Sequence, residues 1–112
     1  MKPVILDTSF ILTAVKQKID FFDKLEKEGI SVIIPEQAIK ELEGLGAKLA
    51  LKILNLNSFK IVKFPGKDAD TAIINFAKKN PKALVATLDQ GMMKKLKNRK
   101  MIIRQKKKIE II

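Results

Sequence analysis

The stretch VILDTSF at residues 4–10 joins a short run of branched apolar residues to an aspartate and then to two hydroxyl residues. Residues 3–6 are apolar without alternation, which predicts a strand that is buried on both faces. Residues 8–15 are apolar at helical spacing, and Asp7 or one of the two hydroxyl residues after it could cap this helix. A buried strand that leads directly into a helix is typical of a parallel α/β fold.

The rest of the chain continues this alternation of apolar runs and helical patterns. We expect further strands at 31–34, 59–64 and 83–88, candidate final strands at 101–104 and 109–112, and helices at 20–28, 35–44, 47–56, 67–79 and 90–97. Because strands alternate with helices, we predict a three-layer α/β/α fold with a central parallel sheet of four to five strands. Residues 1–112 are expected to form a single domain.

The apolar helix positions are expected to form the core, and some of them could instead form a dimer contact. These positions are Ile11, Leu12, Phe21, Phe22, Leu25, Leu49 and Ile53, with Leu56 completing the predicted stripe of its helix.

The chain has neither cysteine nor histidine. This excludes disulfides, thiolate zinc sites, cysteine nucleophiles and every mechanism that needs an imidazole. Chemistry would have to rest on carboxylates, hydroxyls, lysines or a bound metal, and Mg²⁺ and Mn²⁺ prefer oxygen ligands. No run of about 18 apolar residues is present, so we expect no membrane span. The N-terminal stretch lacks a signal-peptide cleavage site, and we predict a cytoplasmic protein.

The formal net charge of +11 is concentrated in the second half of the chain. Residues 1–60 contain nine basic and eight acidic residues, whereas residues 61–112 contain fourteen basic and four acidic residues. Such a surplus is typical of a surface that binds a polyanion; a lysine-rich composition that only aids solubility is the alternative, and a membrane surface is a weaker one. The residues expected on this surface are Lys94, Lys95, Lys97, Arg99, Lys100, Arg104, Lys106, Lys107 and Lys108.

Four carboxylates occur where the predicted elements would bring them together. In an open parallel sheet, ligands bind outside the carboxyl ends of the strands. Asp7 ends the first expected strand, and Asp89 follows the strand at 83–88. Glu41 lies in the helix after the second strand, and Asp70 lies in the first turn of the helix at 67–79. Grouped carboxylates repel one another unless a cation neutralises them, so this arrangement indicates a divalent metal site.

Each acid also has a purely structural explanation. Asp7 and Asp89 could cap the helices that they precede, and Glu41 competes with two other glutamates of its helix. Asp70 competes with Asp68, which is the better N-cap candidate. Four neighbours are predicted to orient the carboxylates or a metal-bound water, or else to serve only as caps and strand residues: Thr8, Ser9, Asp68 and Thr87.

Four motifs in order resemble those of the PIN domain family: VILDTSF at 4–10, IPEQAIKELEGL at 34–45, DADTAI at 68–73 and LVATLD at 84–89. The resemblance places the family's catalytic acids on Asp7, Glu41, Asp70 and Asp89. It implies that the three aspartates hold Mg²⁺ or Mn²⁺, and that Glu41 is a further ligand or orients the attacking water. Some members carry a further acid shortly after the fourth one. Residues 91–93 contain no acid, so the resemblance does not decide between one bound metal ion and two.

The resemblance implies an endoribonuclease of one of two kinds, the toxin of a toxin–antitoxin pair or an RNA-processing nuclease, with an antitoxin or a second copy as protein partner. It also implies that the polyanion is RNA, so the basic residues from Lys94 to Lys108 are the predicted RNA-binding residues. A catalytically silent RNA-binding module of the same fold is the alternative, although four acids without a metal would repel RNA. Two other α/β classes fit less well. A receiver domain needs a pair of acids after its first strand, and a haloacid-dehalogenase-like phosphatase needs an aspartate where Ser9 stands.

Overall fold

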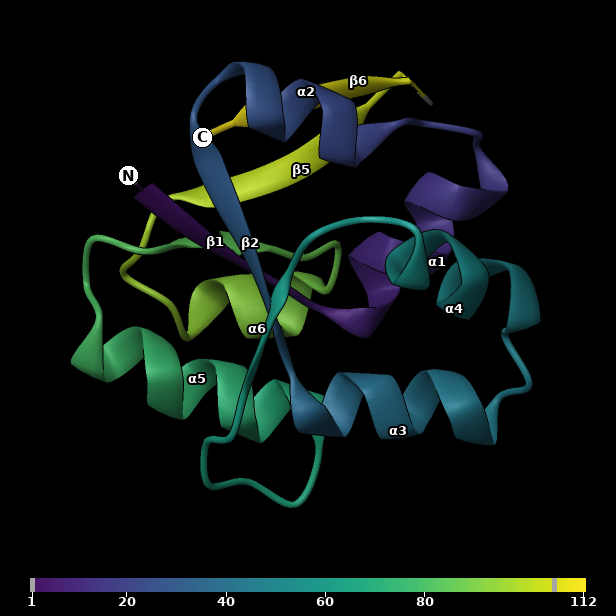
Figure 1. Ribbon diagram of the computed structural model, residues 1–112. Helices are drawn as coiled ribbons and strands as arrows, with labels where there is room; N and C mark the ends of the chain where they lie inside the picture. The colour runs from purple at the N-terminus through teal and green to yellow at the C-terminus, as the bar shows by residue number, and fades with distance from the viewer. Residues whose placement is uncertain (1, 106) are drawn as a thin grey trace.

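The strands form one twisted sheet in the order β3-β2-β1-β4-β5-β6 (Figure 1). The computed structural model describes residues 2–105 and 107–112. Five strands are parallel, and β6 runs antiparallel to β5 as the second arm of a hairpin. The strands are β1 (Lys2–Leu6), β2 (Ile30–Pro35), β3 (Lys60–Val62), β4 (Leu84–Ala86), β5 (Lys100–Arg104) and β6 (Lys108–Ile111).

Helices cover both faces of the sheet, so the predicted three-layer fold with a mainly parallel sheet is confirmed. The described residues contain six strands where four to five were expected, because both candidate segments at the C-terminal end join the sheet. The helices are α1 (Thr8–Lys16), α2 (Phe21–Lys27), α3 (Glu36–Gly44), α4 (Lys48–Asn55), α5 (Ala69–Lys79) and α6 (Gln90–Lys94).

The central strand β1 divides the core into two. Val4 and Leu6 pack with residues of α1, α2 and α4 on one face, while Ile5 packs with residues of α5 and α6 on the other. All three side chains are fully buried, as the apolar run without alternation predicted. Figure 1 shows α5 and α6 together on one side of the sheet, apart from α1, α2 and α4.

Helix α4 turns a different face to the core from the one that the sequence predicted. Ala50 and Leu54 are 2% and 1% exposed, whereas Leu49 is 61% and Leu56 is 74% exposed. The prediction that Leu49 belongs to the core was therefore wrong, and Ile53 is only partly buried. The helix has apolar residues on more than one stripe, and the stripe with the small Ala50 is the one that packs inward.

The other positions that we expected in the core lie there. Ile11, Phe21, Phe22 and Leu25 are buried, and Leu12 is partly buried against the same cluster. Within residues 2–105 and 107–112, no helix has the length and apolar character needed to cross a bilayer.

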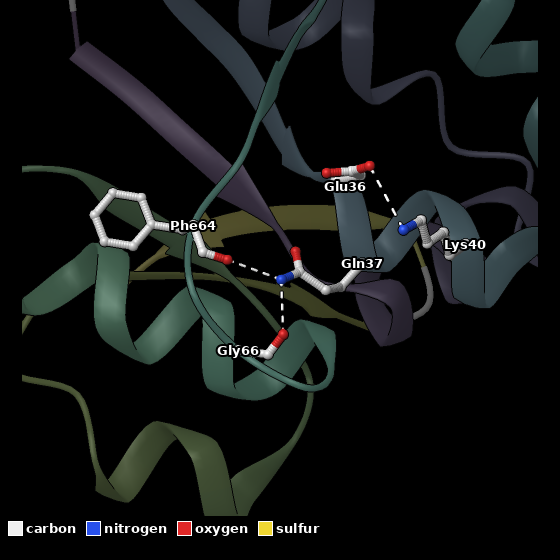
Figure 2. A network of polar contacts seen from close by, with 5 residues as sticks. All are labelled: Glu36, Gln37, Lys40, Phe64 and Gly66. Atoms are coloured by element: carbon white, nitrogen blue, oxygen red, sulfur yellow. Dashed lines mark hydrogen bonds and ion pairs between the residues drawn. The ribbon is translucent and has the colours of Figure 1, made fainter.

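The loop between β3 and α5 is fixed by side chains of two helices. Gln37 of α3 donates from Nε2 to the carbonyl oxygens of Phe64, at 2.8 Å, and Gly66, at 2.9 Å (Figure 2). Asn75 of α5 donates from Nδ2 to the carbonyl oxygen of Pro65 at 2.7 Å. The neighbouring Glu36 is paired with Lys40 at 3.6 Å. These bonds hold the start of α5 against α3.

Gly66 is required in this loop by close packing. A Cβ atom on Gly66 would lie 2.5 Å from the backbone nitrogen and 2.9 Å from the Cα of Ala72, both in the backbone of α5. We expect Gly66→Ala to lower the free energy of unfolding by about 1–3 kcal/mol, because the loop or the helix must shift. Urea unfolding followed by circular dichroism measures this change.

Gly44→Ala is the matched control. Gly44 is the last residue of α3, and an added Cβ would meet no atom within 4 Å. Alanine favours the helical conformation over glycine by up to about 1 kcal/mol, so stability should stay level or rise. Equal losses in the two variants would contradict the packing argument.

Candidate active site

Asp7 and Asp89 lie at the same edge of the sheet. β1 and β4 are parallel neighbours, with Leu6 opposite Ala86. The backbone N–H of Asp7 continues this pairing, since it donates to the carbonyl oxygen of Ala86 at 2.9 Å. Asp89 follows Ala86 by three residues. The structure therefore places both acids at the carboxyl ends of adjacent central strands, where parallel sheets bind ligands.

The Asp7 carboxylate is buried and points across the sheet edge. The residue is 3% exposed, and it stands at the N-cap position of α1 without making a side-chain capping bond. Instead, its Oδ2 accepts hydrogen bonds from Ser9 Oγ at 2.7 Å and from Thr87 Oγ1 at 2.9 Å. The helix-capping explanation of Asp7 is therefore wrong for its side chain.

The same two hydroxyls tie Asp7 to the segment that leads to Asp89. Thr87 Oγ1 accepts from the backbone N–H of Asp89 at 3.1 Å, and Ser9 Oγ accepts from the N–H of Leu88 at 3.2 Å. Thr87 is fully buried. Each hydroxyl donates to the Asp7 carboxylate while accepting from the backbone, so the relative position of Asp7 and Asp89 is defined by short polar contacts.

Asp89 is exposed and uses one oxygen to cap α6. Its Oδ1 accepts from the backbone N–H of Met92 at 3.1 Å. Among the described residues, no side chain or backbone donor bonds to its Oδ2. The capping explanation of Asp89 is thus correct for one oxygen, and the other remains accessible to a ligand.

Glu41 joins three helices. Its Oε1 accepts from Thr8 Oγ1 at 2.8 Å, and its Oε2 accepts from the backbone N–H of Ala69 at 2.8 Å. Thr8 begins α1 directly after Asp7, and Ala69 begins α5 directly before Asp70. Glu41 therefore fixes the starts of the two helices that carry these aspartates.

The pKa of Asp70 is raised by its surroundings. Its pKa is raised to about 6, first by partial burial of the carboxyl group and then by the negative charges of four other acids, Asp7, Asp89, Asp68 and Glu41. The residue lies in the first turn of α5 and remains exposed to solvent. The four acids that the sequence singled out thus share one region of negative potential.

Asp68 is occupied as the N-cap of α5. Its Oδ1 accepts from the Thr71 backbone N–H at 2.9 Å and from Thr71 Oγ1 at 2.7 Å. These two bonds lower the pKa of the Asp68 carboxyl. Asp68 is therefore the capping acid and Asp70 the acid turned toward the group, which separates the two candidates that the sequence left in competition.

No cation of the protein neutralises this group within the described part of the chain. The ion pairs there join Asp23 to Lys27, Glu36 to Lys40 and Arg104 to Glu110, all away from the four acids. Nor do any three acids of residues 2–105 and 107–112 already lie at distances suited to one metal ion. The donors are all hard oxygens, which fits Mg²⁺ or Mn²⁺, and a bound ion would have to draw the carboxylates closer together.

The predicted RNA-binding residues are spread over α6, the loop that follows it, and the β5–β6 hairpin. Lys100 donates from Nζ to the Leu96 carbonyl oxygen at 2.8 Å, and Arg104 is paired with Glu110 at 2.7 Å. Lys107 and Lys108 belong to the β5–β6 hairpin, which rises beyond the carboxyl end of β4 because Ala86 is opposite Met101. The end of α6 and its connection to the amino end of β5 carry Lys94, Lys95, Lys97 and Arg99. Lys106 lies outside the described residues.

The chain resembles known nucleases over nearly its full length. Residues 4–108 match the family described as "PIN like domain". Ribonuclease VapC4 from Methanocaldococcus jannaschii is 31% identical over an alignment of 129 residues that covers 99% of this chain and 97% of that protein. The structure described as the PIN domain endonuclease Utp24 superposes with a TM-score of 0.84 and 28% identity, covering 97% of this chain and 90% of that one.

The raised pKa of Asp70 predicts a pH-dependent loss of stability in the metal-free protein. The pKa of Asp70 is about 6 in the folded state against 3.8 for the free side chain, so the folded state binds more protons between these values. Stability should therefore fall as pH rises through this window and remain lower above it. Asp70→Asn should remove this loss, which leaves the variant with a higher Tm than the wild type at about pH 7.5 and a similar Tm at about pH 3.5.

The measurement is thermal unfolding against pH in the presence of a chelator. Asp23→Asn is the control, because Asp23 is exposed on α2 and pairs with Lys27. It should follow the wild-type profile. A wild-type curve parallel to that of Asp70→Asn would show that the pKa of Asp70 is not raised in the folded state.

Proposed function

The chain belongs to the PIN-like domain family, and on that premise we propose that it is an endoribonuclease that requires Mg²⁺ or Mn²⁺. The observation that carries the proposal is the position of Asp7 and Asp89 at the carboxyl ends of the adjacent strands β1 and β4, with Glu41 and Asp70 close enough for the charges of these acids to act on Asp70. The names of the relatives support it, since one is a ribonuclease and the other an endonuclease. We further propose that residues 1–112 act as one nuclease domain in the cytoplasm, where RNA is available.

Asp7, Asp70 and Asp89 are the residues that would hold the metal. Ser9 and Thr87 orient one oxygen of Asp7, and within the described residues no donor bonds to its Oδ1. Asp89 likewise keeps one oxygen outside its capping bond. Partial burial and the charges of the nearby acids raise the pKa of Asp70, and a bound cation would favour its charged form. When bound, a divalent ion would activate water and offset the charge of the scissile phosphate.

Glu41 is best explained as a positioning residue. Both of its oxygens already accept hydrogen bonds, from Thr8 and from Ala69. Through these bonds it holds Asp7 and Asp70 in register, because Thr8 and Ala69 are their direct neighbours in the chain. Each carboxylate oxygen has a second lone pair, so Glu41 could also contact a water or a metal while it keeps both bonds.

RNA would be recognised through its backbone and shape. The chain has no tyrosine or tryptophan, and Phe10, Phe21, Phe22 and Phe76 are buried in the core. Stacking of bases on aromatic side chains is therefore a poor basis for specificity. The exposed lysines near the site, Lys107 and Lys108 of the hairpin among them, can contact phosphates instead. Both a toxin and an RNA-processing nuclease fit this form of recognition.

We expect Asp7→Asn and Asp89→Asn each to lower the rate of RNA cleavage by at least about 100-fold, because each removes a charge that the metal needs. The assay is cleavage of a panel of single-stranded and structured RNAs in Mn²⁺ or Mg²⁺. A chelator should stop the wild-type reaction, and Asp23→Asn should cleave at the wild-type rate. Circular dichroism would establish that the variants remain folded.

Two results would count against the proposal in different ways. Variants that cleave as well as the wild type would place the activity at another site or in a contaminant. A wild type that binds RNA without cutting any member of the panel would favour the catalytically silent RNA-binding module.

We also propose that a second copy of the chain covers the exposed face of α4. Leu49 and Leu56 are 61% and 74% exposed. Beside them lies a groove of about 390 Å³, lined mainly by apolar residues of α1, α2 and α4. Neighbouring apolar side chains of this size are costly to leave in water, which favours a protein interface.

Leu49→Lys combined with Leu56→Glu should convert a dimer to a monomer, because charged side chains resist burial at an apolar interface. Sedimentation equilibrium measures the change. Ile61→Lys on the edge strand β3 is the control, since Ile61 is also exposed, at 53%, but lies outside this groove. A monomeric wild type would rule out the second copy and leave the face to a different chain, such as an antitoxin.

A further inference from the structure

Two loops meet at the amino-terminal edge of the sheet, opposite the edge that carries the acids. One loop joins α5 to β4 and the other joins α6 to β5. Asn98 in the second loop is 5% exposed and donates from Nδ2 to the carbonyl oxygens of Asn80 and Ala83 in the first, both at 2.9 Å. The side-chain amide therefore holds the two loops side by side.

These loops and the start of β1 bring five cations to this edge. Val4 is opposite Leu84, so Lys2 and Pro3 at the start of β1 lie beside the loop that precedes β4. A concavity of about 580 Å³ is lined by Lys2, Lys79, Lys82 and the two prolines, Pro3 and Pro81, among others. All three lysines are exposed. We call Lys2, Lys79, Lys82, Lys97 and Arg99 the amino-edge patch.

Little negative charge balances the amino-edge patch. Residues 2–6, 78–88 and 90–100 contain no acid, and no ion pair within the described residues involves a member of the patch. Lys79 lies 5.9 Å from the centre of the Phe64 ring, a weak contact that leaves its charge intact. Glu26 and Glu28 are the nearest acids, since Ile30 is opposite Lys2 and Glu26 lines a neighbouring concavity with Pro3, and these two charges do not balance five cations. Ile112 is joined to Lys100 by two backbone hydrogen bonds. Even with a terminal carboxylate on Ile112, the patch keeps a surplus of positive charge.

We propose that the amino-edge patch binds the phosphodiester backbone of RNA at a site separate from the acids. This inference rests on the proposed function, because it takes RNA as the ligand. A concave surface with several lysines and no carboxylate suits a chain of phosphates, which it can contact at more than one point. Of the five cations, the sequence pattern had indicated only Lys97 and Arg99.

The position of the amino-edge patch determines which RNAs can use it. β1 spans the sheet with five residues, so the two edges are separated by about 15–20 Å. A short oligonucleotide seated at the acids cannot reach around the molecule, whereas a long or folded RNA can. The patch therefore discriminates in favour of larger RNA and adds nothing to the cleavage of a short one.

The test compares two triple variants of equal charge. One is Lys2→Gln, Lys79→Gln and Lys82→Gln, which removes the three lysines that line the concavity. The other is Lys16→Gln, Lys48→Gln and Lys52→Gln, which removes three exposed lysines of α1 and α4. Binding of a long structured RNA to the full chain is measured by fluorescence anisotropy at several salt concentrations, without metal so that no cleavage occurs. Cleavage of a short single-stranded oligonucleotide is measured separately with Mn²⁺.

We expect the concavity variant to bind the long RNA about 10-fold or more weakly, with a salt dependence reduced by about 2 to 3 in log–log slope. The control triple should change affinity by less than about 3-fold. Both should cleave the short oligonucleotide at the wild-type rate, and urea unfolding should show that both are folded.

Equal losses of affinity in the two triples, with short-oligonucleotide cleavage intact, would overturn this inference and leave the proposed nuclease function standing. If the wild type does not cleave RNA but the concavity variant selectively loses binding of the long RNA, the proposed nuclease function is overturned and the RNA-binding role of the amino-edge patch stands. Competition by polyglutamate as strong as that by RNA of equal charge would overturn the assignment to a phosphodiester backbone.

Discussion

Repulsion between carboxylates that share one edge of the sheet is the constraint on which the site depends. Asp7 is buried, Asp70 is held at a raised pKa, and no lysine or arginine of the described residues pairs with the group. A fold keeps such an arrangement only if something else opposes the repulsion. Here the hydroxyls of Thr8, Ser9 and Thr87 and the backbone N–H groups that begin α5 and α6 supply it.

The helices owe their placement to the same contacts. Glu41 bonds to the first residues of α1 and α5, while Gln37, one helical turn earlier, holds the loop that precedes α5 (Figure 2). Helix α3 therefore acts as a support that sets where Asp70 stands. The close approach of Gly66 to Ala72 has the same effect from the other side. Fold stability and the site therefore depend on the same contacts, because Thr8 and Ala69, which Glu41 holds, are the chain neighbours of Asp7 and Asp70, which would bind the metal.

The charge of the protein is also divided in space. Asp7 and Asp89 lie at the carboxyl edge of the sheet, the β5–β6 hairpin extends beyond the carboxyl end of β4, and the amino-edge patch lies on the opposite side. A phosphate chain would be repelled by the acids until a cation neutralises them and attracted elsewhere throughout. On the proposed function, this division would make metal binding a condition for RNA to enter the site, while the rest of the surface would still attract phosphates.

The sequence by itself determined the parallel α/β fold, because the apolar runs at 4–6 and 84–86 and the helical spacing between them allow few other arrangements. It also placed Asp7 and Asp89 at strand ends and Asp70 in the first turn of a helix, since these positions follow from local pattern. Only the tertiary structure decided which apolar stripe of α4 is buried, that Glu41 braces two helices, and that Lys2, Lys79 and Lys82 meet. These outcomes depend on contacts between segments distant in the chain, and periodicity along one segment contains no information about what that segment will face.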